Sequence, residues 1–145
     1  DLLPIFQLLG TGFTSKQIAT HFLDEHQKYD AFTKISLVYP HAVASLKVGQ
    51  GVKSEGSLVI SGTKGYIYVP APWWKTDYFE VRYENQQNNK RYFYQLDGEG
   101  LRYELLSFLK AIRTGKEFSY VANDISKAIT STIADFYAHQ DMTVI

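Results

Sequence analysis

The sequence predicts an α+β fold. We expect an open, mostly antiparallel sheet of about six to seven strands, with helices packed on one face and the other face available to a partner. Apolar and polar residues alternate through much of residues 31–96, helical stripes lie on either side of that stretch, and aromatic residues make up 15% of the chain. The 145 residues contain no linker or repeat, so a single domain over 1–145 is expected.

The first 30 residues contain one clear helix and one ambiguous segment. Residues 2–9 carry an apolar stripe that ends at a glycine, as helices commonly do. Residues 14–28 fit two structures, because Thr14 and Gln17 resemble a capping box whereas residues 18–22 alternate like a strand. The local rules slightly favour the helix.

Three successive hairpins are predicted between residues 31 and 96, and together they imply an antiparallel sheet. The first hairpin joins strands 33–39 and 43–48 through a turn at Pro40-His41. The second joins strands 57–60 and 66–69 through Gly62-Thr63-Lys64-Gly65, and the third joins strands 78–83 and 91–96 through the loop 85–89.

Two amphipathic helices are predicted near the end of the chain. The first has Gly115 just beyond its last turn, and its apolar face consists of Leu101, Leu105, Phe108, Leu109 and Ile112. The second carries a stripe from Ile125 to Phe136, with Asn123 or Asp124 as its expected N-cap.

Charge and composition argue against several classes of protein. Fifteen basic and fifteen acidic residues leave no net charge, so we expect no nucleic-acid binding. No apolar run is long enough to cross a membrane, and the absence of cysteine fits a reducing cytoplasm. The chain lacks an initiator Met and starts inside an apolar pattern, which is typical of a truncated protein.

Few residues have the spacing of a catalytic or metal site. The glycine clusters lack the spacing of a dinucleotide-binding turn, and the four histidines lack that of a helical zinc site. Glu99 and Glu104 flank a helix start and are not expected to act as an acid/base pair. We therefore predict no metal site in this chain, and no Gly-x-Ser-x-Gly turn supports a nucleophilic serine.

The segment from Pro70 to Asp77 is the most distinctive. Its adjacent Trp73 and Trp74 must point in different directions, and aromatic faces stack on the apolar face of sugar rings. A structural alternative is that one Trp fills a core while the other covers a sheet edge.

Several stretches resemble the C-terminal domain of the Gfo/Idh/MocA oxidoreductase family. Residues 56–74 are similar to its characteristic hairpin, and residues 98–104 to the start of its first helix after the sheet. Residues 39–46 resemble an earlier hairpin of the family and residues 1–10 the helix end before it. The resemblance extends over nearly the whole chain in a consistent order.

The resemblance implies a fold and a separate role for each of the two domains of these enzymes. In this family an N-terminal Rossmann domain binds NAD or NADP, and a C-terminal open sheet forms the substrate pocket and the dimer interface. Residues 14–24 should then be a strand, against the local preference for helix. The family's Glu-Lys-Pro motif is absent, and Asp1 matches only the last position of its Asp-x-Gly-x-His/Tyr-x-x-Asp motif. The resemblance thus implies that the catalytic Lys and His or Tyr lie outside this chain, so the fragment alone should contain no catalytic residue, bind no cofactor and be inactive.

The function implied is that of half an NAD(P)-dependent oxidoreductase acting on a sugar, inositol or related polyol. By the same resemblance, Trp73 and Trp74, and with less support Tyr68 and Tyr103, are candidates to line the substrate site. A homo-oligomer, dimer or tetramer, would form through the sheet face. The alternative is a stand-alone, non-catalytic module for carbohydrate binding or dimerisation.

Overall fold

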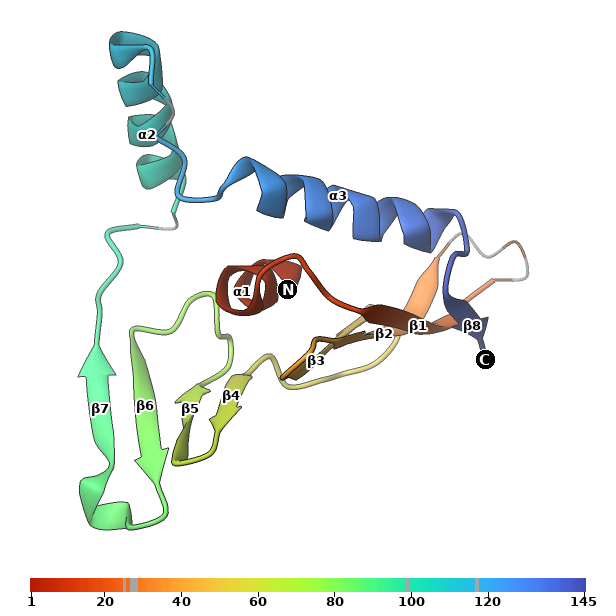
Figure 1. Cartoon of the computed structure of the whole chain (residues 1–145), viewed down its shortest axis with the longest axis horizontal. Helices are drawn as coiled ribbons and strands as arrows, with labels where there is room; N and C mark the ends of the chain where they lie inside the picture. Colours follow the sequence, from red (N-terminus) through yellow and green to blue (C-terminus); the bar gives the residue numbers. More distant parts are fainter. Residues whose placement is uncertain (25, 27–28, 99, 117) are drawn as a thin grey trace. The chain divides into compact units, whose positions relative to one another are not determined.

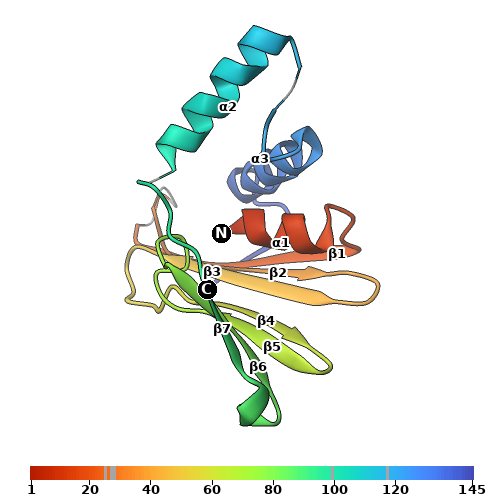
Figure 2. The ribbon, with the colours of Figure 1, turned by 90° about the vertical axis from the view of Figure 1, so that its left-hand side faces the viewer.

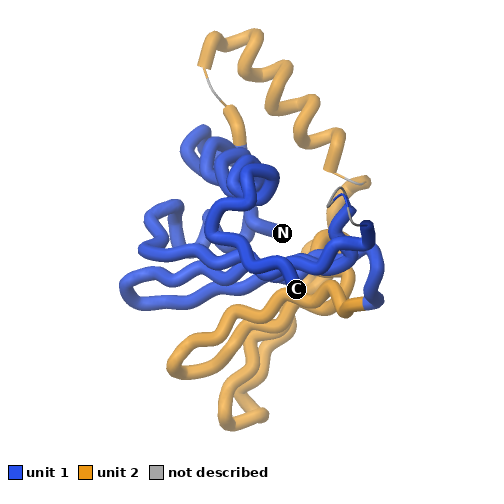
Figure 3. Tube along the Cα trace, turned by 90° about the vertical axis from the view of Figure 1, so that its right-hand side faces the viewer, with its two compact units in different colours: residues 1–53, 120–145 blue, residues 54–119 orange. Residues whose placement is uncertain are grey.

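The chain divides into two compact units (Figure 3). Unit 1 comprises residues 1–53 and 120–145, and unit 2 comprises residues 54–119. Each unit contains its own four-stranded sheet, so the α+β class is confirmed with eight strands instead of the six to seven expected. The single domain over 1–145 stays a prediction. The computed structural model describes residues 1–24, 26, 29–98, 100–116 and 118–145.

Unit 1 is a mixed sheet with two helices on one side (Figures 1 and 2). The strands β1, β2 and β3 are antiparallel, and β8 runs parallel to β1 at one edge. The helices α1 and α3 contact each other. In spatial order the strands are β3 (Val43–Gly49), β2 (Asp30–Val38), β1 (Ser15–Phe22) and β8 (Met142–Val144), and the helices are α1 (Leu2–Leu9) and α3 (Asn123–Tyr137).

The core of unit 1 follows from the alternation in β2. Every second residue from Ala31 to Leu37 is buried, as expected for a strand with one face against helices. Phe6 of α1 and Ile18 of β1 are also buried in this cluster. The apolar stripe of α3 packs against it through Ile125, Ala128, Ile129 and Phe136.

Residues 15–22 form a strand, so the local preference for a helix was wrong and the family resemblance was right. Ile18 lies opposite Ile35 of β2 on one side and Met142 of β8 on the other. Both Ile18 and Thr20 are completely buried, and the Thr20 hydroxyl lies 2.8 Å from that of Thr33. Contacts with strands distant in the sequence therefore outweighed the capping signal.

Two further details of unit 1 differ from the expectations. The strand β8 has only three residues, too short for a recognisable alternation, and it forms because it pairs with β1. The N-cap of α3 is Ala122, whose carbonyl accepts the first helical hydrogen bond from Ser126 N–H at 3.1 Å. Asn123 is thus the first helical residue and not the cap.

A buried ion pair joins α3 to the sheet of unit 1. The Lys16 side chain is 4% exposed, and its ammonium contacts the carboxylate of Asp135 in α3. Asp141 Oδ2 lies 3.7 Å from the same Lys16 Nζ. A lysine so deeply buried requires such partners, so this pair fixes the position of α3 over β1.

Unit 2 is a meander of four antiparallel strands in the order β4-β5-β6-β7, as the second and third predicted hairpins require. The chain then leads into the second helix. The elements are β4 (Leu58–Gly62), β5 (Gly65–Val69), β6 (Tyr78–Tyr83), the 3-10 turn η1 (Gln86–Asn88), β7 (Lys90–Phe93) and α2 (Leu101–Thr114).

The two units differ in how much they bury. Every fully buried residue of the described chain belongs to unit 1. The sheet and helix of unit 2 instead carry partly or largely exposed side chains, many of them aromatic. None of the described helices is long and apolar enough to cross a membrane.

Candidate functional site

The segment between β5 and β6 holds the two tryptophans in a defined arrangement. The backbone N–H of Trp73 donates to the carbonyl of Gly56 at 2.8 Å. The Trp74 ring lies against Gly56, where a Cβ atom would come within 3.2 Å of the ring. The two indoles are nearly perpendicular, with centroids 5.9 Å apart. Trp74 remains 56% exposed, so it has a face available for a ligand.

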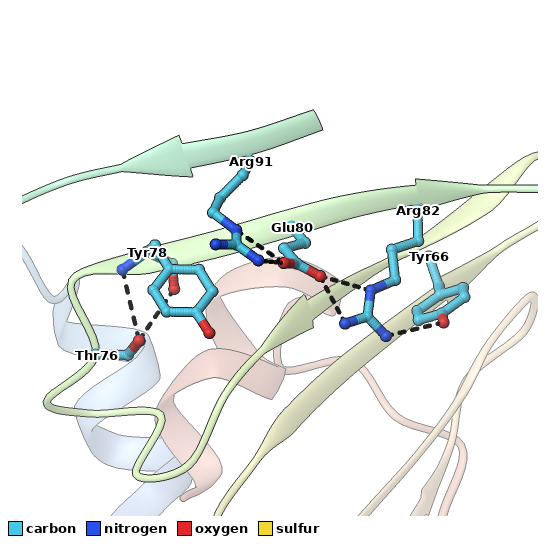
Figure 4. Close-up of polar contacts among 6 residues, drawn as sticks. All are labelled: Tyr66, Thr76, Tyr78, Glu80, Arg82 and Arg91. Atoms are coloured by element: carbon cyan, nitrogen blue, oxygen red, sulfur yellow. Dashed lines mark hydrogen bonds and ion pairs between the residues drawn. The ribbon is translucent and has the colours of Figure 1, made fainter. Parts of the chain in front are cut away.

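A polar and aromatic ladder crosses the sheet of unit 2 (Figure 4). Tyr68, Glu80 and Arg91 lie directly opposite one another on β5, β6 and β7, so their side chains share one face. Tyr78 and Arg82 lie two residues either side of Glu80 and join the same face. Strand register alone therefore assembles the ladder from three separate strands.

Glu80 is the centre of the ladder. Arg82 Nε donates to Glu80 Oε2 at 2.7 Å, and Arg91 donates to Glu80 Oε1 through Nε at 2.9 Å. These hydrogen bonds, first from Arg91 and then from Arg82, hold the pKa of the Glu80 carboxyl below its usual value. Glu80 is thus held as a carboxylate at neutral pH and is a poor proton donor.

Aromatic rings support the two guanidinium groups. The Arg82 guanidinium lies 4.6 Å from the centre of the Tyr68 ring and donates to the Tyr66 hydroxyl at 3.4 Å. The Arg91 guanidinium lies 4.7 Å from the centre of the Tyr78 ring. The hydrogen bonds with Tyr66 and Glu80 raise the pKa of Arg82, which stays charged. Such stacking orders long side chains before any ligand or partner arrives.

Tyr103 has a local role at the start of α2. Its hydroxyl accepts a hydrogen bond from the backbone N–H of Asp97 at 3.0 Å, and Arg102 forms an ion pair with the Asp97 carboxylate. These contacts close the turn that leads into the helix.

The four predicted site residues therefore lie in three groups. Trp73 and Trp74 contact each other, Tyr68 belongs to the ladder, and Tyr103 closes the turn before α2. Sequence reasoning missed Glu80 and the arginines of the ladder. The pattern Tyr-x-Glu-x-Arg at 78–82 would have indicated one shared strand face, but only the register adds Arg91 to it.

No metal centre is found in the part of the chain that the structure describes, because no three His, Asp or Glu residues are grouped there to hold an ion. Glu99 lies outside the described residues, so its expected independence from Glu104 stays a prediction. The described geometry offers aromatic faces, hydrogen-bond donors and a fixed carboxylate, which are means of binding a ligand or a protein.

Comparisons with known proteins identify the fold. No model of a protein family matches the sequence, and neither does any curated protein. Solved structures do match. Biliverdin reductase from Synechocystis sp. PCC 6803, in complex with biliverdin and NADP+, is 16% identical, and the match covers 95% of this chain and 43% of that chain with a TM-score of 0.72.

Two other solved oxidoreductases match in the same way. The 3-ketoreductase KijD10 from Actinomadura kijaniata, in complex with NADP and TDP-benzene, is 9% identical over 99% of this chain and 44% of its own, with a TM-score of 0.75. An oxidoreductase from Agrobacterium radiobacter, in complex with NAD+, L-tartaric acid and magnesium, is 18% identical over 94% of this chain and 44% of its own, with a TM-score of 0.65.

The identities are too low to show more than the fold. This chain spans less than half the length of each of these chains. The match nevertheless includes almost all of residues 1–145, as the resemblance in the sequence predicts. The chain therefore shares its fold with these oxidoreductases over less than half of their length, in agreement with the resemblance to the C-terminal domain of the Gfo/Idh/MocA family.

Proposed function

We propose that this chain is the substrate-binding and subunit-binding half of an NAD(P)-dependent oxidoreductase that works in the cytoplasm on a sugar, inositol or related polyol. The observation that carries this proposal is the fold match, which spans almost the whole chain but less than half of oxidoreductases solved with NADP or NAD+. In this proposal the nucleotide, the hydride transfer and the proton relay belong to a separate nucleotide-binding half.

The substrate class rests on two observations. Trp74 presents an exposed aromatic face on a segment anchored to Gly56, as stacking against a sugar ring requires. Among the matched proteins, one is a 3-ketoreductase and another is solved with L-tartaric acid, which carries secondary hydroxyl groups as a polyol does. In this proposal Trp73 and Trp74 line the substrate site. The other two candidates, Tyr68 and Tyr103, lie in the ladder and at the turn before α2.

The ladder face is our proposed subunit interface. Tyr and Arg are enriched at the centres of protein interfaces, and this face presents Tyr66, Tyr68, Tyr78, Arg82 and Arg91 in ordered positions. We propose a dimer or tetramer in which this face meets another subunit. Replacing Arg82 by Ala should then weaken association, measured by light scattering over a range of concentrations. A chain that stays monomeric at the highest concentrations would contradict the interface.

The decisive experiment uses the protein encoded by the complete reading frame that contains residues 1–145. It should bind NAD or NADP, detected by calorimetry, and oxidise or reduce members of a sugar and polyol panel. Trp74→Ala should raise KM by about tenfold through the lost stacking contact, while leaving nucleotide affinity unchanged. Tyr120→Ala is the matched control, because Tyr120 is an aromatic residue of unit 1 that is even more exposed, 80% against 56% for Trp74. A protein that binds neither nucleotide would refute the proposal.

The exposed Trp74 face also favours a second candidate, a non-catalytic carbohydrate-binding module. This module would bind saccharides as the 145-residue chain alone, with quenching of tryptophan fluorescence that Trp74→Ala removes. A titration without any fluorescence change would favour the oxidoreductase, in which affinity requires both halves.

A further inference from the structure

The helix α2 carries an apolar surface that its own unit leaves uncovered. Its apolar stripe consists of Leu101, Leu105, Phe108, Leu109 and Ile112, which recur at the three- and four-residue spacing of one helix face. These five side chains are between 48% and 64% exposed, and α2 contains no buried residue. A contiguous exposed surface of this kind is unusual in a monomer and marks an interaction site.

The flanking chain contacts the opposite side of the helix. Tyr103 and Lys110 lie away from the stripe, because they are offset from it by half a turn. Tyr103 accepts the hydrogen bond from Asp97, and the Lys110 ammonium lies 4.2 Å from the centre of the Phe118 ring. The segments before and after α2 therefore contact the side of the helix opposite the stripe and leave the stripe open.

The helix α3 carries a similar apolar stripe, but this one is covered by the core of its unit. Its apolar residues, including Ile125, Ile129 and Phe136, pack on the core of unit 1. The helix α2 has nearly the same length and the same spacing of apolar residues, yet it has no such core beneath it. Isolated helices of about 14 residues are only marginally stable in water, so α2 requires a partner for its stripe.

We propose that the apolar stripe of α2 is the docking surface for the nucleotide-binding half of the same polypeptide. This inference rests on the proposed function. The matched oxidoreductase chains extend over more than twice the length of the match, and they hold NADP or NAD+. The match spans 94–99% of this chain, so that extra length is present in proteins that share this fold almost completely.

The charges beside the stripe define the partner surface. Arg102 and Arg113 lie along one edge of the stripe and Glu104 along the other. Arg102 already pairs with Asp97, so the docked surface is apolar at its centre, with an acidic group facing Arg113 and a basic margin facing Glu104. This docking links the helix that follows the substrate-binding sheet to the domain that holds the nucleotide.

Hydrogen exchange of the α2 amides tests the proposal, compared between the 145-residue chain and the protein of the complete reading frame. The amides should exchange at least about tenfold more slowly in the complete protein, because docking buries several large apolar side chains. Phe108→Glu should return the exchange to the rate in the shorter chain, and Leu105→Ala should act more weakly in the same direction. Ser107→Glu is the matched control, because it places the same charge on the back of the helix.

The outcomes separate this inference from the proposed function. Nucleotide binding with equal α2 exchange in both proteins would overturn the docking site and leave the oxidoreductase proposal intact. No nucleotide binding would refute the proposed function, and the docking inference with it. Protection of α2 that appears in the 145-residue chain as its concentration rises would identify a second copy as the partner and overturn the inference. Unfolding of that chain by Phe108→Glu would show that the stripe packs within it, with the same consequence.

Discussion

Asn in place of Asp135 should strongly destabilise unit 1. The substitution removes the carboxylate that contacts Lys16, whose side chain is 4% exposed. Loss of one partner from a buried ion pair costs about 3–5 kcal/mol, because the remaining charge is left without compensation. Asp141 stays 3.7 Å from the ammonium, so we expect a value near the lower end, about 3 kcal/mol.

Urea unfolding followed by far-UV circular dichroism measures this free energy directly. The same loss corresponds to a melting temperature lower by roughly 9 °C, at about 3 °C per kcal/mol for a chain of this size. A double variant, Lys16→Met with Asp135→Leu, should recover most of the stability, because it removes both charges and keeps apolar volume at the contact.

Asp124→Asn provides the matched control, since Asp124 is an exposed carboxylate in the first turn of the same helix. It should cost at most about 1 kcal/mol through the helix dipole. An Asp135→Asn variant no less stable than the Asp124→Asn control would refute the role assigned to the buried pair.

Three further predictions concern single groups. The pKa of the Glu80 carboxyl, measured by carbon NMR, should lie below the ordinary value of 4.5. The stability that its ladder contacts contribute is then present above pH 4.5 and is lost as the pH falls through the lowered pKa. Glu80→Gln should abolish this acid dependence. Burial raises the pKa of the Tyr39 hydroxyl above its ordinary value of 10. The free energy of unfolding, measured in urea, should therefore fall as the pH rises past 10, and Tyr39→Phe should remove this fall. Gly65→Ala should destabilise the β4–β5 hairpin by about 1–3 kcal/mol, because the new Cβ would lie 2.5 Å from the Arg82 carbonyl oxygen. Hydrogen exchange of the hairpin amides measures this loss. Gly12→Ala is the control, because a Cβ at Gly12 would meet no atom within 4 Å.

Much of the fold was predictable because its signals are local. Alternation and turn residues indicate the hairpins of β2–β3, β4–β5 and β6–β7, and each pairs as expected. The helical stripes predict α1, α2 and α3, and Gly10 and Gly115 adopt the positive φ that suits a helix end. Trp73 and Trp74 were expected to point in different directions, whereas their rings lie nearly perpendicular and in contact, with centroids 5.9 Å apart.

The candidate site was only partly predictable, because it depends on register. Nothing near Glu80 in the sequence indicates that Arg91, eleven residues later, reaches the same carboxylate. Tyr68 was a candidate through family resemblance, but its contact with Arg82 follows from the pairing of β5 with β6. Side chains on different strands meet only after the strands have aligned.

The amino-acid sequence by itself determined which segments carry helical or strand periodicity, where the turns fall, and the resemblance that the solved structures bear out at the level of the fold. Tertiary structure decided the rest. Residues 15–22 became a strand because β2 and β8 lie on either side of them, and Lys16 is buried because Asp135 reaches it from a helix more than a hundred residues away. Backbone hydrogen bonding and charge burial depend on distant partners, which a local pattern does not specify.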